Sequence, residues 1–198
     1  MAFINHATRE ICCKIVYYGP GLGGKTANVQ HIHDRTVEGS RGTLISLKTQ
    51  SDRTLFFDFL PIDLGKISGF SVRLQLYTVP GQVHYRASRR LILRGVDGVV
   101  FVADSQRGRL DADAESMSDL AENLAEQRQS IDRVPLVIQY NKRDLAEHEI
   151  VSVEELRELL NPRGVPELEA AAASGHGVFE TLKAVGRLAL AGISLPRR

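Results

Sequence analysis

Residues 19–26, Gly-Pro-Gly-Leu-Gly-Gly-Lys-Thr, have the types and spacing that bind a phosphate chain. They fit the pattern G-x-x-x-x-G-K-[ST], in which glycines let the backbone wrap closely around a phosphate group. A helix that follows such a loop aims its first N–H groups at the anion. Lys25 would bridge the β- and γ-phosphates, and the Thr26 hydroxyl would bind Mg²⁺. The predicted nucleotide-binding residues of this segment are Gly19, Gly21, Gly23, Gly24, Lys25, Thr26 and Ala27.

A second motif, Asn-Lys-Arg-Asp at residues 141–144, contains the groups that distinguish guanine from adenine. Guanine presents two donors side by side, the ring N1–H and the exocyclic amine, and the carboxylate of Asp144 could accept both. Adenine would leave that carboxylate unpaired, which a buried polar site penalises strongly. Lys142 could lay its alkyl stem over the base, and Asn141 would tie this loop to the phosphate-binding loop. Together the two motifs predict a guanine nucleotide site.

The elements expected around these motifs place both at one edge of a sheet. Ile11–Tyr18 is predicted as a strand and Lys25–His33 as the helix after it, which is the context that the phosphate motif requires. A glycine-rich turn with a chance lysine, the alternative, would not need that context. Gly98–Ala103 and Val134–Tyr140 are continuous apolar runs, typical of parallel strands covered by helices on both faces. The alternation predicts a doubly wound α/β sheet with ligands beyond the carboxyl ends of its strands.

Other periodic segments extend this pattern. Leu55–Leu60 and Val72–Thr78 are expected to form a hairpin, with Asp63, Gly65 and Gly69 in its connection. Further helices are predicted at about residues 112–128, after a capping box formed by Ser152 and Glu155, and at residues 178–190.

Composition and charge exclude several classes of protein. The 25 Lys+Arg against 24 Asp+Glu leave a net charge of +1 over 198 residues, so the basic excess of a nucleic-acid-binding domain is missing. No apolar run approaches the roughly 20 residues that cross a bilayer. The ends of the sequence carry no signal-peptide core, no myristoylation Gly and no prenylation Cys. The adjacent Cys12 and Cys13 cannot staple distant segments. We expect a cytoplasmic protein without a membrane anchor and without direct nucleic-acid binding.

Four segments, residues 17–26, 52–61, 77–82 and 89–98, resemble the Ras-like small GTPases, and the resemblance extends over about residues 3–190. Thr-Val-Pro-Gly-Gln stands where that superfamily has D-x-x-G-Q, with Thr78 in place of the aspartate. This variant is similar to the MglA family, bacterial small GTPases that set cell polarity and drive or reverse surface motility. The resemblance implies an α/β P-loop NTPase fold, a Ras-like small G domain with a central, mostly parallel sheet flanked by helices. It also implies one domain over residues 1–198, with short flexible termini.

The resemblance assigns roles to residues outside the two motifs. Gly81 would offer its N–H to the γ-phosphate, and Gln82 would orient the attacking water. Thr54 resembles the threonine that completes the Mg²⁺ shell, and Arg53 resembles a built-in arginine finger. The catalytic residues implied in this way are Gln82, Arg53 and Lys25.

The resemblance also implies a switch between two states. GTP and Mg²⁺ would order switch I, about Gly42–Asp58, and switch II, Gly81–Arg90, and hydrolysis to GDP would release both. The superfamily motif S-A-K maps weakly onto residues 171–173, where Ala172 would donate its backbone N–H to the guanine oxygen. Intrinsic turnover should be slow and rise about 10³-fold or more with an activating protein. The implied partners are a roadblock-type, MglB-like activator and polarity and motility effectors, with recruitment to a cell pole.

Thr78 leaves the Mg²⁺ site without the acidic residue that the superfamily supplies there, usually through a bound water. Asp58 lies in a strand expected to pair antiparallel with the strand that ends at Thr78, so the two side chains would be neighbours. We expect Asp58 to replace the missing carboxylate, which makes Thr26, Thr54 and Asp58 the predicted metal site. A solvent-facing aspartate in an apolar strand is the alternative.

Two other functions stay open on the sequence. One is a scaffold that holds GTP but barely hydrolyses it, against which Gln82 argues. The other is a P-loop kinase of nucleosides or nucleotides, which would need an acceptor pocket and an arginine-bearing lid. The arginines at positions 86, 89, 90 and 94 have near-helical spacing and form either a partner surface or an inert solvent face.

Overall fold

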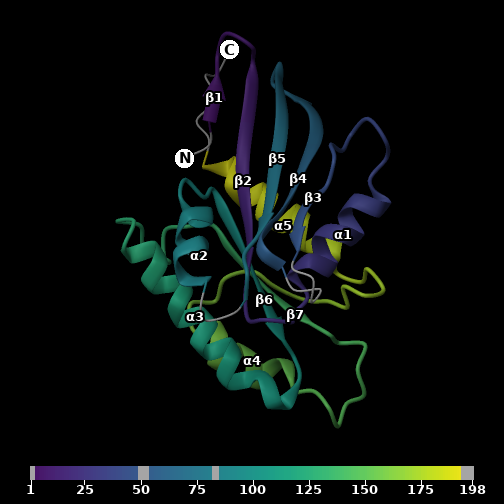
Figure 1. Ribbon diagram of the computed structural model, residues 1–198, viewed down its shortest axis with the longest axis vertical. Helices are drawn as coiled ribbons and strands as arrows, with labels where there is room; N and C mark the ends of the chain where they lie inside the picture. Colours follow the sequence, from purple (N-terminus) through teal and green to yellow (C-terminus); the bar gives the residue numbers. More distant parts are fainter. Residues whose placement is uncertain (1–2, 49–53, 82–84, 193–198) are drawn as a thin grey trace.

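The computed structural model describes residues 3–48, 54–81 and 85–192, and the strands within these ranges form one sheet (Figure 1). Its strand order is β3-β4-β5-β2-β6-β7-β8, and β1 pairs with β2 outside this path. The pairs β2–β5, β2–β6, β6–β7 and β7–β8 are parallel, whereas β1, β3 and β4 pair antiparallel with their neighbours. The strands are β1 Phe3–Asn5, β2 Glu10–Tyr18, β3 Ile45–Lys48, β4 Thr54–Ile67, β5 Phe70–Thr78, β6 Gly98–Asp104, β7 Leu136–Asn141 and β8 Glu167–Glu169.

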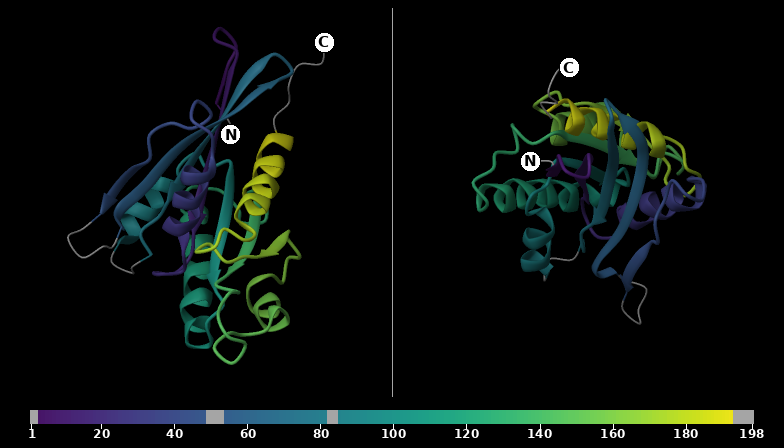
Figure 2. Two further views of the ribbon diagram at one scale, coloured as in Figure 1. Left: turned by 90° about the vertical axis from the view of Figure 1, so that its right-hand side faces the viewer. Right: turned by 90° about the horizontal axis from the view of Figure 1, so that it is seen from above.

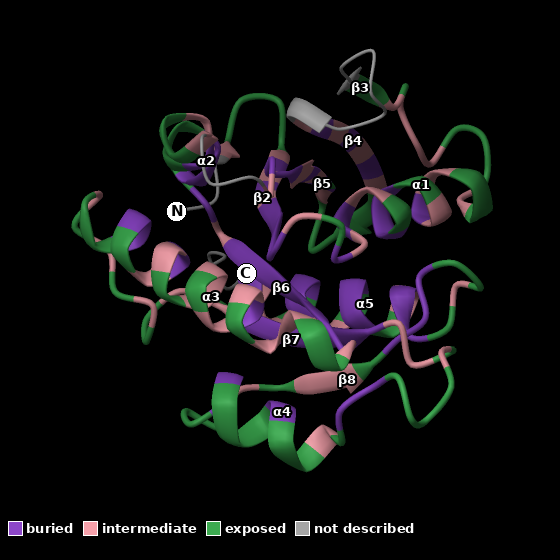
Figure 3. Ribbon diagram, turned by 60° about the horizontal axis from the view of Figure 1, so that its bottom comes forward, coloured by how far each residue is buried: buried purple, intermediate pink, exposed green. Residues whose placement is uncertain are grey.

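Helices cover both faces of the sheet, as the alternating sequence pattern predicts. Ile32 of α1 and Val185 of α5 pack into the core on one face. Leu93 of α2, Leu124 of α3 and Leu156 of α4 pack into the core on the other. Each helix turns its buried side to the sheet and its exposed side outward (Figure 3). The helices are α1 Lys25–Arg35, α2 Arg86–Leu93, α3 Leu110–Ala125, α4 Val153–Leu160 and α5 Val178–Ala191.

The β4–β5 hairpin is longer than the sequence indicates, because two residues predicted in its connection belong to β4. Asp63 and Gly65 form an irregular step in the strand, where the Asp63 carboxylate accepts the Gly65 N–H at 2.7 Å and the pairing register shifts. The turn itself is at Ser68 and Gly69, both with positive φ, 50° and 84°. The prediction was wrong there because a strand bulge uses the same residue types as a turn. This hairpin and the β1–β2 hairpin project at the same end of the molecule (Figure 2).

Other predicted boundaries differ by a few residues from the observed ones. α1 extends to Arg35, and α3 ends at Ala125 rather than near Arg128, whose φ is +60°. The predicted cap of α4 is confirmed, since the Glu155 N–H donates to the Ser152 hydroxyl at 3.1 Å. The short strands β1, β3 and β8 have no counterpart in the predicted elements. Over the described ranges, no helix is both long and apolar enough to span a bilayer.

Candidate functional site

The predicted phosphate-binding loop lies between β2 and α1, and its glycines stand where side chains would collide with neighbouring segments. A Cβ atom on Gly19 would lie 2.2 Å from the Val102 carbonyl oxygen in β6. A Cβ on Gly24, the N-cap of α1 at φ +101°, would lie 2.1 Å from the Asn141 side chain. The loop is therefore held tightly between β6 and the residue that ends β7, with the N-terminus of α1 opening beside it.

Lys25 is buried at the start of α1, with its ammonium turned back onto the loop. Its Nζ atom donates to the carbonyl oxygens of Gly19 at 2.8 Å and Pro20 at 2.6 Å. Burial, reinforced by the positive charge of Arg89, lowers the pKa of Lys25 to about 7. A cation whose charged form is disfavoured in this way gains most from an anion placed beside it, as a phosphate group would be.

One buried carboxylate connects four segments next to this lysine. Asp58 in β4 accepts hydrogen bonds from the hydroxyls of Thr26 at 2.7 Å, Thr78 at 2.8 Å and Ser46 in β3. The Asp58 N–H in turn donates to the Thr78 hydroxyl at 2.8 Å. The expected proximity of Asp58 and Thr78 is thus present, and the alternative of a solvent-facing aspartate is wrong, because Asp58 is 1% exposed.

These donors fit the coordination chemistry of Mg²⁺. The described residues contain no group of three acidic, His or Cys side chains that could hold a metal by themselves. Mg²⁺ does not require one, since it binds few protein oxygens and keeps waters and substrate phosphate oxygens. The Thr26 hydroxyl can offer a lone pair to the ion while its proton stays with Asp58. Thr54 begins β4, and its side chain is outside what the structure describes.

Asn141, the last residue of β7, connects both predicted motifs. Its Nδ2 atom donates to the Gly23 carbonyl in the phosphate loop at 2.8 Å, and its Oδ1 atom accepts the Ala172 N–H at 2.9 Å. The resemblance to small GTPases implies that the Ala172 N–H donates to guanine, whereas in this structure it donates to the Asn141 side chain. Asp144 is exposed, and none of the residues described donates to its carboxylate. The carboxylate that would accept from guanine is therefore accessible at the edge of the site.

Gly81 is the one predicted switch II site residue within the described ranges. A Cβ atom on Gly81 would lie 2.4 Å from the Cα and N atoms of Gly21, so the two backbones touch and no side chain fits between them. This contact places the start of switch II directly against the phosphate loop. Arg53 and Gln82 lie outside the described residues, and their roles stay predictions.

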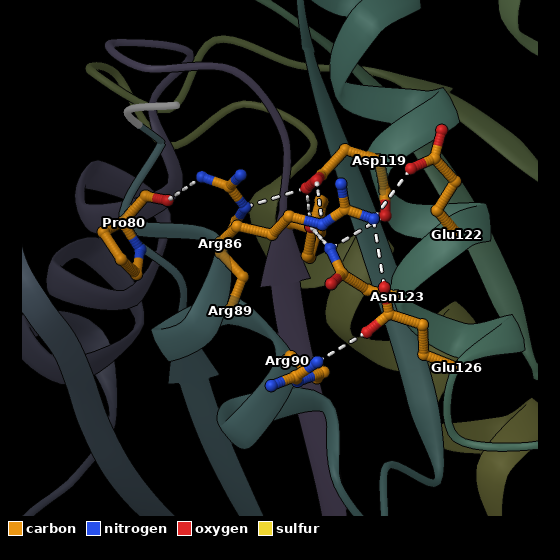
Figure 4. A network of polar contacts seen from close by, with 9 residues as sticks. Pro80, Arg86, Arg89, Arg90, Asp119, Glu122, Asn123 and Glu126 are labelled. Atoms are coloured by element: carbon orange, nitrogen blue, oxygen red, sulfur yellow. Dashed lines mark hydrogen bonds and ion pairs between the residues drawn. The ribbon is translucent and has the colours of Figure 1, made fainter. Parts of the chain in front are cut away.

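Of the four arginines predicted to form a partner surface or an inert face, Arg89 is buried, whereas Arg86, Arg90 and Arg94 are exposed. Figure 4 shows three of them on α2 paired with carboxylates of α3. Arg89 is 6% exposed and donates to Asp119 at 2.8 Å and to the Pro80 carbonyl, just before Gly81, at 3.4 Å. The ion pairs of the other two arginines on α2 are exposed: Arg86 contacts Glu122 and Glu126, and Arg90 contacts Glu126.

Two charged residues at the carboxyl end of β6 were missed by the sequence analysis. Asp104 is fully buried and accepts from Lys142 Nζ at 2.7 Å, so that lysine is paired beside the base-reading motif. Arg109 ends the short 3₁₀-helix η2, Arg107–Arg109, and donates to the Gly21 carbonyl at 2.6 Å. Their position in the sequence could have indicated them. Both follow β6, which lies between β2 and β7 in the sheet, and parallel sheets bind ligands beyond the carboxyl ends of such strands.

The comparisons with known proteins agree with this site. Residues 14–191 match the family model described as Ras family. The chain is 61% identical over 190 residues to the mutual gliding-motility protein MglA of Myxococcus xanthus, covering 96% of each chain. It is 27% identical over 173 residues to the human Ras-related protein Rab-44, covering 87% of this chain and 15% of that one. Ras-related protein RIC1 of Oryza sativa is 31% identical over 111 residues, covering 56% of this chain and 52% of the rice protein. With the phosphate loop, the base-reading motif and the sheet between them in place, this chain belongs to the Ras family of small GTPases.

Proposed function

We propose that this protein is a GTP-binding and GTP-hydrolysing switch that controls cell polarity and motility through effectors bound in the GTP state. The observation that carries the nucleotide part is the Asn141 side chain, which joins the phosphate loop at Gly23 to the loop of Ala172. One side chain thereby sets the distance between the groups for phosphates and those for guanine. The motility part rests on the similarity to MglA of Myxococcus xanthus, a mutual gliding-motility protein.

Base selection is assigned to Asp144 and phosphate binding to Lys25. The accessible carboxylate of Asp144 would accept the two adjacent donors of guanine, and adenine has no donor pair to offer. Lys25 would turn its remaining N–H toward the β- and γ-phosphates, where its charge is stabilised by the anion.

Hydrolysis needs positioning and charge stabilisation more than covalent chemistry. Gln82 would orient the attacking water, and the Gly81 N–H would donate to the γ-phosphate. Arg53 would stabilise the charge that spreads over the γ-phosphoryl oxygens in the transition state. Thr26 and Thr54 would hold Mg²⁺ with Asp58 behind them, and the bound ion would neutralise charge on the β- and γ-oxygens.

Loss of the γ-phosphate removes the group that Gly81 and Thr54 contact, and so frees switch II and switch I. The two forms then present different surfaces to effectors. A roadblock-type activator, MglB-like, would raise the slow intrinsic rate by about 10³-fold or more. Recruitment of the GTP form to a cell pole belongs to the same proposal.

Nucleotide competition and single-turnover hydrolysis test this function. The purified protein should bind GTP and GDP and exclude ATP, and it should release phosphate slowly alone and faster with the activator. ATP that competes with GTP within about tenfold would contradict the role of Asp144. Bound GTP that is not hydrolysed even with the activator would indicate a binding scaffold, and a phosphorylated acceptor would indicate a kinase.

A further inference from the structure

Leu22 carries a side chain at a position of the phosphate loop where the backbone is left-handed. Its φ is +66°, a conformation that glycine adopts freely and that leucine disfavours. The side chain is 75% exposed, so burial does not compensate for this backbone conformation. Something else has to hold the loop in this shape.

Arg109 supplies such a restraint from a distant part of the chain. Its Nη2 atom donates to the Gly21 carbonyl oxygen at 2.6 Å, and its Nε atom lies 3.6 Å from the carboxylate of Asp104. Asp104 has no exposed surface and is fixed by the Lys142 ammonium at 2.7 Å. The guanidinium therefore lies at ion-pair distance from a buried carboxylate on one side, and its Nη2 atom holds the loop backbone on the other.

The Gly21 carbonyl and the Leu22 N–H belong to the same peptide group. A trans peptide is planar, with its C=O and N–H pointing to opposite sides, so an anchor on the oxygen also fixes the direction of the N–H. No acceptor among the described residues takes the Leu22 N–H. The donor is left free on the side of the peptide away from Arg109.

We propose that Arg109 is a positioning residue that holds the Gly21–Leu22 peptide so that the Leu22 N–H donates to the diphosphate group of a bound guanine nucleotide. This inference rests on the proposed function and adds a residue that acts on the phosphates without touching them. The charge-assisted bond to the Gly21 carbonyl offsets the backbone strain at Leu22, and nucleotide binding profits because the donor is already oriented.

The first test compares GDP with GMP, which lacks the second phosphate. Arg109→Ala should weaken GDP binding by about tenfold or more, as expected for the loss of a charge-assisted hydrogen bond, and leave GMP binding within about twofold. Arg107→Ala is the matched control, because Arg107 lies in the same short helix but contacts the His148 carbonyl, and it should change neither. Affinities are measured by competition against a fluorescent guanine nucleotide, and melting curves show that each variant is folded.

The second test uses glycine to remove the need for the anchor. Arg109→Ala should cost much less GDP affinity when it is made in a Leu22→Gly background than when it is made in the unmodified protein, because glycine reaches positive φ without strain. The proposal is overturned by unchanged GDP binding in Arg109→Ala, by equal losses for GDP and GMP, which would mean that Arg109 acts through Asp104 on the base loop, or by an equal cost of Arg109→Ala in the two backgrounds. If Arg109→Ala does not fold, Arg109→Lys is judged by the same GDP-to-GMP ratio. Unmodified protein that fails to bind GDP would instead contradict the proposed function.

Discussion

Asp58 places a buried carboxylate beside Thr78, the position at which the Ras-like pattern has its aspartate. The acidic group that Ras-like proteins place at the end of the strand before switch II is here a threonine, Thr78, and the carboxylate comes from the neighbouring strand. The Thr78 hydroxyl now bonds to that carboxylate at 2.8 Å instead of replacing it. The negative charge therefore still lies behind Thr26, which is where a hard cation would need it.

Replacing Asp58 should change the Mg²⁺ dependence of nucleotide retention. Asp58→Ala removes the group that orients the Thr26 hydroxyl, so we expect a higher Mg²⁺ concentration to be needed before GDP dissociation becomes slow. Asp63→Ala, in the irregular step of the same strand, should behave as the unmodified protein. The measurement is the GDP dissociation rate against free Mg²⁺, and coincident curves for Asp58→Ala and the unmodified protein would remove Asp58 from the metal site.

Lys25 predicts a pH dependence of nucleotide binding. Its pKa of about 7 in the folded, nucleotide-free chain lies below the 10.5 of an unfolded chain. The free energy of unfolding therefore decreases as the pH falls from about 10.5 to about 7, because in this range the unfolded chain binds a proton on Lys25 that the folded chain does not. A bound phosphate favours the charged lysine, so above pH 7 GDP binding should take up a proton and weaken as the pH rises.

Calorimetry in buffers of different ionisation enthalpy measures this proton uptake. We expect nearly one proton to be taken up per GDP bound at about pH 8.5. Burial raises the pKa of Asp113 to about 7, so at this pH its carboxyl is already deprotonated and does not obscure the uptake by Lys25. Lys25→Arg keeps a permanent charge and should show no uptake at that pH. Equal uptake in both proteins would assign the proton to another group.

At the scale of elements, the α2–α3 contact gives switch II a fixed base. Arg89 lies in α2, near the end of the predicted switch II, and its buried side chain joins Asp119 of α3 to the Pro80 carbonyl just before Gly81 (Figure 4). The pairs of Arg86 and Arg90 are exposed and contribute little.

Arg89 and Arg90 should therefore differ strongly in their effect on stability. Arg89→Ala removes the buried charged partner of Asp119, which keeps its hydrogen bond from the Tyr18 hydroxyl, and should cost about 2 kcal/mol of unfolding free energy. Arg90→Ala should cause a much smaller loss. Urea denaturation of the GDP-bound protein measures both. Similar losses for the two variants would show that the buried ion pair of Arg89 contributes no more to stability than the exposed ion pair of Arg90.

The sequence predicts those elements whose signal lies within the element itself. β6 and β7 are buried along their whole length, and their continuous apolar runs predict such buried strands. The edge strands β3 and β8 are three or four residues long and depend on the neighbour that they pair with, so no local pattern marks them. The same limit applies to the site. Lys25 and Asn141 belong to compact motifs, but the bond from Arg109 to Gly21 spans 88 positions and appears only once the sheet is formed.

At the scale of the whole molecule, the sheet places the parts of the predicted hydrolysis reaction on different strands and connections. The phosphate loop follows β2, switch II follows β5, and the base-reading motif follows β7. Nucleotide binding therefore depends on the whole sheet, whereas the proposed positioning of water and stabilisation of transition-state charge are assigned to Gln82 and Arg53 in the switch segments.

Gln82→Leu and Arg53→Ala should separate these two properties. Both residues are assigned to the water or to charge in the transition state, so each variant should bind GTP normally and leave it nearly unhydrolysed, with or without activator. Filter binding and single-turnover phosphate release measure the two quantities. Normal hydrolysis by Arg53→Ala with an inactive Gln82→Leu would mean that the arginine comes from the partner or is not needed.

The bridge made by Asn141 can form only after most of the chain has been synthesised. The Asn141 side chain bonds to Gly23, 118 positions earlier in the chain, and to the N–H of Ala172, 31 positions later. A nascent chain exposes its phosphate loop early, but Asn141 cannot join that loop to the segment around residue 172 until this segment has left the ribosome. Contacts of such long sequence separation form late in folding. A chain that ends before residue 172 lacks one side of this bridge, and we expect it to retain guanine nucleotide less tightly than the full chain.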